Sequence, residues 1–537
     1  MATPTDLPAQ ADAQPGGSDA PSTELPPDEV LRDPPESDAA AEAERRAPLP
    51  WRTIALGTAG TVLLMLSAVG AGGTLIHDPL IGTGPLSAIR YGHGKMLATA
   101  TLYIGFALVV WAWVRLGRHV LAGRVAARPV LLAAVCWAIP MLFSPPVFTR
   151  DVFSYLAQGA QALHGFDPYA AGPVVLNDYP DLVQNVHPFW QNTPAPYGPL
   201  FLLIAKGVAA VVGQHMIIGV ILMRLVLVPG LVLTVWALRG LVHELGGKMS
   251  VTMWLAFASP MTVVHLIGGP HNDMLMLGFL TSGTLLTLRR KHWAGIALAT
   301  LAMAIKPTAA MALPFLVLVW AAHLPDEKWG RRFLKALAPS LGIFVGLFAA
   351  LTWVAQLNLG WIVALRAPAM VENWLSAPTA LGEIVHSLVR IFVDTPIGFY
   401  TIPARVLGGL VLAYVGVKQW LRSRDGGPDA VKRMALILFL TAALSPVTMP
   451  WYLMWGFVIA TAMAWQRRHL AIIGALSVFL VLTYTPGGED LLYDWWFMAC
   501  AAALSVLAGV SLLRPDPLGL FTTHHEDPEA DKPVATR

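Results

Sequence analysis

The sequence predicts an all-α polytopic membrane protein built around one long polar insert. Hydrophobic residues make up 55% of the 537-residue chain and charged residues only 13%, whereas about 25% of residues are charged in ordinary soluble domains. Many apolar runs approach the ~20 residues that a helix needs to cross a bilayer. Because lipid cannot satisfy an unpaired backbone, these runs are expected to form helices.

The polar insert, residues 144–198, interrupts this pattern with charges, prolines and aromatic residues. Unpaired backbone groups are too costly in hydrocarbon, so the insert must lie at the interface or in water on one side of the membrane. Its aromatic side chains suit an interfacial surface that contacts sugars. We therefore interpret residues 144–198 as the active-site loop and the apolar helices as its scaffold.

The two ends of the chain differ from its middle. Residues 1–50 are rich in Pro, Ala, Asp and Glu, and residues 514–537 are similar. Such segments bury too little apolar surface to fold, so both are predicted to be disordered tails around a membrane domain at residues 51–513. The polar start shows no cleavable signal peptide. Cys136 and Cys500 lie inside apolar runs, which makes a disulfide framework unexpected.

Five clusters of basic residues orient the helices, because such clusters favour cytoplasmic loops. They can all face the cytoplasm only if one of the two apolar runs between Leu200 and Leu238 does not cross. We interpret residues 199–213 as that re-entrant or interfacial helix. About fourteen crossings remain, with both tails inside and residues 144–198 outside. The clusters are Arg115, Arg118, Arg124 and Arg128; Arg289, Arg290 and Lys291; Lys328, Arg331, Arg332 and Lys335; Lys418, Arg422, Arg424, Lys432 and Arg433; and Arg467 and Arg468.

Asp151 is the strongest candidate for chemistry. It follows Arg150 directly after an apolar run, at a depth where an ionisable group indicates function. The alternative is that the pair only caps a helix and orients the loop. We favour the interpretation of Asp151 as a general base at the membrane surface.

Two isolated cations are candidates for binding a phosphate. Lys306 could reach the interface with its amine or contact an anion, and both interpretations stay open. For Arg224, which lies inside an apolar run near its start, the phosphate role is favoured because arginine is costly to bury unpaired.

The remaining polar stretches are expected on the outer face with the loop. Asp167 precedes a proline, which favours a structural turn. His271 and Asp273 follow a Gly-Gly-Pro sequence, but two side chains make no complete metal site. We expect them to hold the loop or to contact an acceptor hydroxyl, and we expect no metal. The stretches at 373–379 and 449–452 complete this face.

Seven segments in this order carry a family resemblance: FTRDVFSYLAQG, GFDPYAAGP, TPAPYGPLF, GGPHNDMLM, AIKPTAAMALPFL, NWLSAPT and MPWYLMW. The chain resembles the GT-C membrane mannosyltransferases of mycobacteria and corynebacteria over residues 54–512. The resemblance implies a GT-C-type glycosyltransferase fold with a large outer loop. It also implies that Asp151 is the catalytic acid of that loop. Many such enzymes carry a second nearby carboxylate, whereas the next acid here is Asp167.

The resemblance further implies an inverting α-(1→6)-mannosyltransferase of the cytoplasmic membrane, acting at its outer side. The donor would be polyprenyl-phosphate-mannose and the acceptor a growing, lipid-anchored mannan chain of lipomannan or lipoarabinomannan. No cofactor is implied, and no nucleic acid partner, because the basic residues lie in short loops between helices. A lipid-phosphate donor also agrees with the lack of a glycine-rich phosphate loop.

Residue type and resemblance together give three sets of candidate site residues. Asp151 is the catalytic base. Arg150, Arg224 and Lys306 are expected to contact the donor phosphate. The acceptor or sugar contacts are expected from Tyr155, Asp167, Tyr169, His187, Trp190, Tyr197, His271, Asn272, Asp273, Asn373, Trp374, Trp451 and Tyr452.

Two other function classes compete with this interpretation. Apolar runs broken by Gly, Pro and charge suit a secondary transporter, which builds its site from discontinuous helices. A lipid-linked sugar flippase is the other alternative. The one-sided polar insert and the lack of an internal repeat argue against a transporter.

Overall fold

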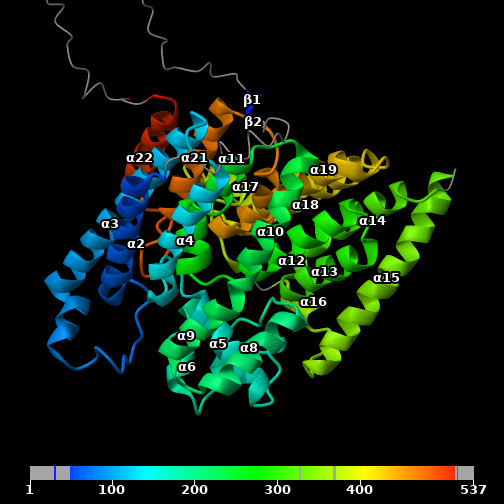
Figure 1. The fold of residues 1–537 in the computed structure, drawn as a ribbon. Helices are drawn as coiled ribbons and strands as arrows, with labels where there is room; N and C mark the ends of the chain where they lie inside the picture. Colours follow the sequence, from blue (N-terminus) through cyan, green and yellow to red (C-terminus); the bar gives the residue numbers. More distant parts are fainter. Residues whose placement is uncertain (1–29, 32–48, 326–327, 367–369, 515–516, 518–537) are drawn as a thin grey trace, which may run out of the picture.

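The computed structural model describes residues 30–31, 49–325, 328–366, 370–514 and 517 (Figure 1). The predicted disordered tails lie almost entirely outside these residues. Helices form nearly all of the regular structure, and the one described sheet pairs β1 (Val30–Leu31) with β2 (Trp465–Gln466).

The first half of the chain holds the polar insert and the elements around it. In order these are α2 (Trp51–Ala71), η1 (Pro85–Arg90), α3 (Gly92–Leu121), α4 (Ala127–Phe143), α5 (Asp151–Leu163), η2 (Pro173–Val175), α6 (Pro180–Gln184), α7 (Pro188–Gln191), α8 (Pro199–Val212), α9 (Met216–Leu227), α10 (Pro229–Leu245), α11 (Met249–Ala256) and η3 (Met261–Gly268).

The second half continues the same helical arrangement. It contains α12 (Asp273–Leu288), α13 (His292–Ile305), η4 (Pro307–Ala312), α14 (Leu313–Ala322), α15 (Trp329–Val354), α16 (Trp361–Ala364), α17 (Ala377–Val389), α18 (Gly398–Leu421), α19 (Gly427–Leu444), η6 (Pro450–Leu453), α20 (Met454–Ala460), α21 (Arg467–Val481) and α22 (Trp495–Leu513).

The chain is an all-α membrane protein. Among the described residues, six helices are long and apolar enough to cross a bilayer, or seven if the bent pair α11–η3 is one span. Several other apolar helices have only 10–17 residues. The expected total of about fourteen crossings therefore stays a prediction.

The helix α8 agrees in length with the interpretation of residues 199–213. Its 14 residues extend about 21 Å at ~1.5 Å per residue, which is less than the ~30 Å of a bilayer core. It packs against α5, where Gly159 permits a close approach: a Cβ at Gly159 would lie 2.2 Å from the Ala205 carbonyl oxygen. That α8 does not cross the membrane remains a prediction.

Three apolar helices are broken at the same end of the protein. The first of these helices also bends by 46° between α11 and η3, before its break. The segment η3 is a π-helix, a form that is frequent at functional sites. The break between η3 and α12 carries the sequence Gly268–Asp273. The other two breaks precede η4, at Lys306, and η6, at Met449. Polar groups of the broken backbones and of the loop are thereby gathered at one end.

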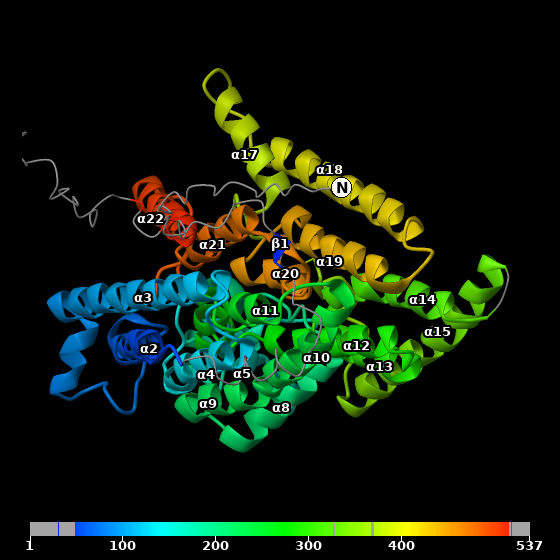
Figure 2. The same ribbon diagram turned by 45° about the horizontal axis from the view of Figure 1, so that its top comes forward.

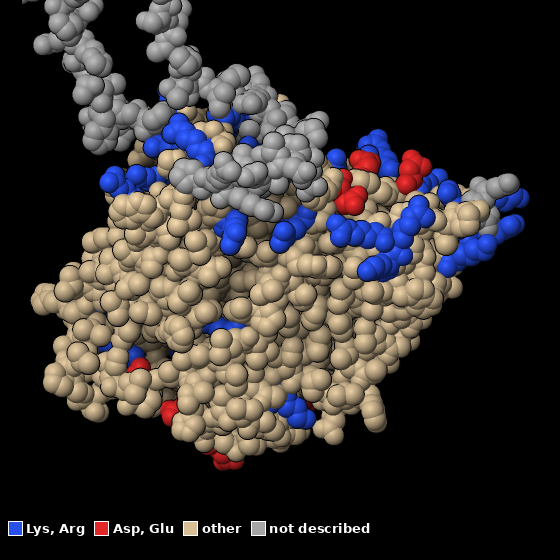
Figure 3. Space-filling model, viewed as in Figure 1, with Lys and Arg blue, Asp and Glu red and all other residues tan. Residues whose placement is uncertain are grey.

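Lys and Arg side chains are concentrated at the opposite end (Figure 3). These are the loops between helices that the sequence predicts to be cytoplasmic, such as those after α12 and between α18 and α19. At the end that holds the polar insert, few basic residues are visible in this view. On this face, the basic residues are therefore gathered at the end opposite the polar insert.

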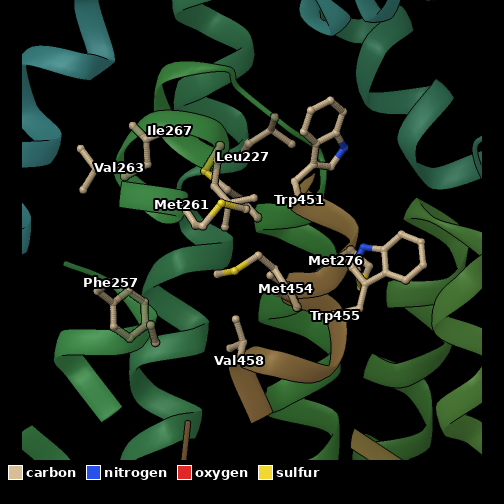
Figure 4. Packing of buried hydrophobic residues seen from close by; sticks show 14 of the residues in the cluster. Leu227, Phe257, Met261, Val263, Ile267, Met276, Trp451, Met454, Trp455 and Val458 are labelled. Carbon is tan, nitrogen blue, oxygen red and sulfur yellow. The ribbon is translucent and has the colours of Figure 1, made fainter. Parts of the chain in front are cut away.

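The core behind the polar end is rich in methionine and tryptophan. Figure 4 shows Met454 and Val458 of α20 facing Met261 of η3 and Leu227 of α9. All four side chains are at most 2% exposed. Methionine adapts its shape to irregular gaps, which suits a core where broken helices meet.

The helices α15, α17 and α18 lie at the edge of the molecule, and α17 packs against α18 (Figure 2). Within their apolar windows, only 11% of α15 and 17% of α18 residues are buried. Because these helices expose mostly apolar side chains, lipid is their natural environment.

We predict that the polar insert faces the outside of the cell. In a variant without Cys136 and Cys500, Asp178→Cys should react with a membrane-impermeant thiol reagent in intact cells, because Asp178 is exposed in the insert. The matched variant Asp425→Cys, exposed between α18 and α19, should react only after permeabilisation. The reverse pattern of labelling would contradict this topology.

Candidate active site

The turn before α5 fixes the position of Asp151. Phe148 has a φ of 58°, which is rare for a bulky residue, and its amide donates to the Pro486 carbonyl at 2.9 Å. The next residue, Thr149, packs against Gly269, where an added Cβ would lie 2.3 Å from Thr149 Cγ2. The turn is therefore clamped between two other polar segments, and α5 begins at a fixed point.

Asp151 is the first residue of α5, and 20% of its side chain is exposed. Arg150, not Asp151, occupies the N-cap position. His271 Nδ1 lies 3.5 Å from Asp151 Oδ2. Burial raises the pKa of Asp151 to about 6, although the charge of Lys306 acts in the opposite direction. Such a carboxylate is ionised at neutral pH and is basic enough to accept a proton.

A buried ion pair joins the three helix breaks. Lys306 Nζ lies 2.8 and 3.0 Å from the two carboxylate oxygens of Asp273, and neither side chain is more than 8% exposed. Trp455 Nε1 donates to the same carboxylate at 2.5 Å. The Lys306 ammonium also lies 4.4 Å from the ring centroid of Tyr452, within the range of a cation–π interaction. Each charge is thus matched by several partners.

Aromatic side chains from two directions surround these charges. The indole of Trp451 stacks on the His271 imidazole with 3.9 Å between ring centroids. On the other side, Tyr155 of α5 and Tyr197 before α8 meet edge to face at 5.4 Å. Burial, and with it the charge of Asp151, raises the pKa of both tyrosines well above its usual value. Both remain phenols, which can donate hydrogen bonds.

Two polar side chains beside the ion pair lack hydrogen-bond partners. His271 and Asn272 are fully buried, and neither the imidazole nitrogens of His271 nor the amide atoms of Asn272 have a partner among the described residues. Unpaired buried polar groups are costly, and native proteins satisfy most of them. Their concentration next to Asp151 indicates a site that binds a polar ligand.

Arg224 does not line this site, which contradicts the expectation that it contacts the donor phosphate. It is fully buried, and its guanidinium donates to four backbone carbonyls at the ends of α4 and η3. The partners are Leu142 and Ser144 of the first segment, and Ile267 and Gly268 of the second. These hydrogen bonds offset the free energy needed to bury the guanidinium. Because they reach two segments, Arg224 holds the ends of α4 and η3 together.

Arg150 lies between the site and an apolar groove. Its guanidinium donates to the carbonyls of Asn185 and Thr74 and lies 5.3 Å from the ring centroid of Phe153. Among the described residues, no carboxylate is within ion-pair distance of it. Thr74 and Phe153 also line the groove, which has a volume of about 190 Å³. The other groove residues are mostly apolar and come from α2, α4, α9 and the segment 73–90.

Three residues of the polar insert make contacts away from Asp151, and two of them contact other segments of the chain. Asp167 accepts from the Tyr169 amide at 2.9 Å, forming the expected turn, and from the Asn358 side chain at 2.6 Å. Tyr169 packs in a separate small apolar cluster. Trp190 contacts Phe189 edge to face. Among the described residues, no hydrogen bond or ring contact joins these three side chains to Asp151, and their role in sugar binding stays a prediction.

Two further candidates support the site from outside. The Asn373 amide donates to the Thr448 carbonyl at 3.1 Å, immediately before the segment that carries Trp451. Trp374 donates to the Leu492 carbonyl at 2.5 Å. These contacts occupy one N–H of each side chain, and direct binding of sugar by Asn373 and Trp374 stays a prediction.

His187 stays near the site, and its charge acts on Asp151. Its Nε2 lies 3.3 Å from a carboxylate oxygen of Glu489.

Neither Glu489 nor Trp455 was identified from the sequence. Trp455 could have been, because it stands in the same short aromatic stretch as Trp451 and Tyr452. Glu489 has no comparable sequence signal.

The arrangement supports proton abstraction beside an anion. It combines one partly exposed carboxylate, a buried charged pair, phenol and amide donors, and aromatic faces that can pack on sugar rings. Among the described residues, no group of three or more His, Cys, Asp and Glu side chains is placed to hold a metal ion.

Two family models match the chain. Residues 54–322 match the model described as alpha-(1->6)-mannopyranosyltransferase, N-terminal domain, and residues 378–514 match the model described as MptB C-terminal domain. No solved structure gives a significant match.

Individual relatives extend the match over nearly the whole chain. Alpha-(1->6)-mannopyranosyltransferase A of Mycobacterium tuberculosis is 40% identical, covering 87% of this chain and 90% of the relative. The protein of the same name in Corynebacterium glutamicum is 30% identical, covering 87% and 99%. Alpha-(1->6)-mannopyranosyltransferase B of Corynebacterium glutamicum is 27% identical, covering 81% and 76%.

We predict that Asp273→Asn strongly destabilises the protein. It leaves the Lys306 charge buried without its partner, and breaking such a pair typically costs about 3–5 kcal/mol. The melting temperature in detergent should fall by several degrees. The double variant Asp273→Leu/Lys306→Met should recover much of this loss.

The matched control is Asp429→Asn, which removes an exposed ion pair with Arg433 on α19. Such pairs contribute about 0.3–0.5 kcal/mol, so its melting temperature should hardly change. Equal losses in Asp273→Asn and Asp429→Asn would contradict a structural role for the buried pair.

Proposed function

Because this chain belongs to the α-(1→6)-mannopyranosyltransferase family, we propose that it is an inverting enzyme of the GT-C class that elongates a mannan chain. In this proposal the donor is polyprenyl-phosphate-mannose, and the acceptor is the lipid-anchored mannan of lipomannan or lipoarabinomannan. Transfer takes place on the outer side of the cytoplasmic membrane. Family membership sets aside the transporter and flippase alternatives.

The observation that carries the mechanism is the environment of Asp151. A partly exposed carboxylate begins α5, with unpaired polar groups of His271 and Asn272 beside it. In the proposed step, Asp151 takes the proton of the acceptor 6-hydroxyl. That oxygen forms a bond to the anomeric carbon, and the bond from this carbon to the phosphate oxygen breaks. Polyprenyl phosphate leaves with the electron pair, and one displacement inverts the configuration.

The charges near Asp151 favour Arg150 as the donor-phosphate contact. Arg224 is used by backbone carbonyls, and Lys306 is matched by Asp273. Among the described residues, the hydrogen bonds of Arg150 go only to carbonyls and no carboxylate lies at ion-pair distance from it, so its charge is available to a phosphate. Lys306 contributes from a distance, by favouring the ionised form of Asp151.

The apolar groove beside Arg150 supports a lipid-linked donor. A chain lying in it would place its phosphate end near Thr74 and Phe153, next to Arg150. From there the sugar would reach Asp151, the neighbour of Arg150 in sequence. A nucleotide sugar would leave the apolar lining unused.

The proposed function is tested by mannose transfer in membranes that contain the protein. Wild-type protein should transfer mannose from polyprenyl-phosphate-mannose, and not from GDP-mannose, to an α-1,6-mannan acceptor. A general base contributes typically 10²–10⁴-fold, so Asp151→Asn should lower turnover by about that factor at unchanged protein level. Near-wild-type transfer by Asp151→Asn would take the base role from this residue.

The same assay gives a pH prediction. Asp151 must be ionised to accept a proton, and its pKa is raised to about 6. The value of kcat/KM should therefore be constant at neutral pH and fall about tenfold per unit below pH 6. The matched variant Asp178→Asn, at an exposed position of the insert, should keep this profile. Full activity of the wild type at pH 4.5 would contradict the assignment.

A further inference from the structure

The imidazole of His271 is held in one orientation next to Asp151. Its ring is fully buried and stacked on Trp451, with 3.9 Å between centroids and 23° between planes. Its backbone is fixed on both sides: its amide donates to Leu266, and its carbonyl accepts from Met274, each at 3.2 Å. The ring has little freedom to turn away from the Asp151 carboxylate.

We infer that His271 is a positioning residue, whose Nδ1–H donates to the Asp151 carboxylate and holds it in the ionised, correctly oriented form. This inference rests on the proposed role of Asp151 as base. It replaces the expectation that His271 contacts the acceptor or holds the loop.

The assignment of the proton follows from hydrogen-bonding capacity. An ionised carboxylate only accepts hydrogen bonds, so a neutral imidazole facing it must carry its proton on Nδ1. Burial, together with the charges of His265 and Lys306, lowers the pKa of His271 well below its usual value. The ring is therefore neutral, with one N–H donor, and the Asp151 carboxylate lies 3.5 Å from Nδ1.

The present separation of 3.5 Å between Nδ1 and Oδ2 is longer than a formed hydrogen bond. Catalytic hydrogen bonds are often long without substrate and tighten in the complex. His271 Nε2 has no hydrogen-bond partner among the described residues, so a shift of the ring by under 1 Å toward Asp151 breaks no hydrogen bond of the imidazole.

Other groups also act on Asp151 and must be separated from His271 in any test. The charged ones are Lys306, His187 and Asp273, and Thr149 forms a side-chain hydrogen bond to it. The phenols of Tyr155, Tyr197, Tyr452 and Tyr484 are close enough to respond to its charge. None of these groups changes when His271 is replaced by a residue of similar volume.

The effect on the reaction has a specific form. During transfer, the proton of the mannan 6-hydroxyl moves to Asp151. The hydrogen bond from His271 Nδ1–H then weakens, because a carboxylic acid accepts hydrogen bonds less well than a carboxylate. This hydrogen bond therefore stabilises the ionised form of Asp151 before the transfer step. Removing the donor should raise the pKa of Asp151 by about one unit.

The test compares the acid side of the pH profile in three variants. His271→Phe keeps the stack on Trp451 but has no donor, so the fall in kcat/KM should move up by about one pH unit. Transfer should be about fivefold lower at pH 6 and near wild type at pH 8.5. His271→Asn has an N–H near the Nδ1 position and should keep the wild-type midpoint. His265→Phe replaces the neighbouring buried histidine and should also keep it.

Each outcome decides the inference. The inference would be overturned if kcat/KM of His271→Phe fell with the wild-type midpoint pH. It would also be overturned if kcat/KM were lowered equally at every pH, because a structural defect does not recover at high pH. If His271→Phe does not accumulate, His271→Asn decides: a midpoint near pH 6 supports the inference, and a shift to pH 7 contradicts it. If Asp151→Asn is inactive but His271→Phe shows no shift, only this inference falls. If Asp151→Asn is active, the base assignment and this inference both fall.

Discussion

The buried ion pair between Lys306 and Asp273 is the constraint on which the polar end of the protein depends. Burying two charged groups away from water is tolerated only when they form a close, well-oriented ion pair and their other hydrogen-bonding groups also have partners. Here both carboxylate oxygens face the ammonium, and Trp455 and Tyr452 supply the further contacts. Because the partners come from α12, the α13–η4 junction and η6–α20, the pair can form only when three broken helices are in register. The buried side of the site, formed by Asp273, Lys306 and their contacts, is thereby fixed before any substrate binds.

The cations of the site illustrate how a membrane protein divides its charges between structure and binding. Arg224 and Lys306 are the more deeply buried, and each is satisfied within the protein. Arg150 is only partly buried, donates hydrogen bonds to carbonyls and lies over the Phe153 ring. An anionic ligand would therefore be attracted to the edge of the site, between the apolar groove and Asp151. This division suits a reaction between a lipid phosphate in the membrane and a sugar chain in water.

The helical class could be predicted from the apolar composition. The polar insert and Asp151 were singled out because charge and proline stand out in an apolar chain, and the catalytic role of Asp151 stays a prediction. The three breaks were visible for the same reason, since Gly-Gly-Pro, Lys-Pro and Met-Pro interrupt apolar runs. The partners of buried groups could not be predicted in this way. Arg224 is satisfied by backbone carbonyls whose availability depends on where α4 and η3 end. The supporting contact of Asn373 to the Thr448 carbonyl likewise depends on tertiary packing. An unpaired cation and a satisfied one look alike in sequence.

The most direct test of the central claim is a structure of the Asp151→Asn variant with polyprenyl-phosphate-mannose bound. The account predicts the prenyl chain in the groove at Phe153, the phosphate at Arg150, and the anomeric carbon beside the substituted carboxyl position. It would be contradicted by a donor bound in the cavity lined by His243 and Lys432, because the lining of that cavity includes neither Arg150 nor Asp151.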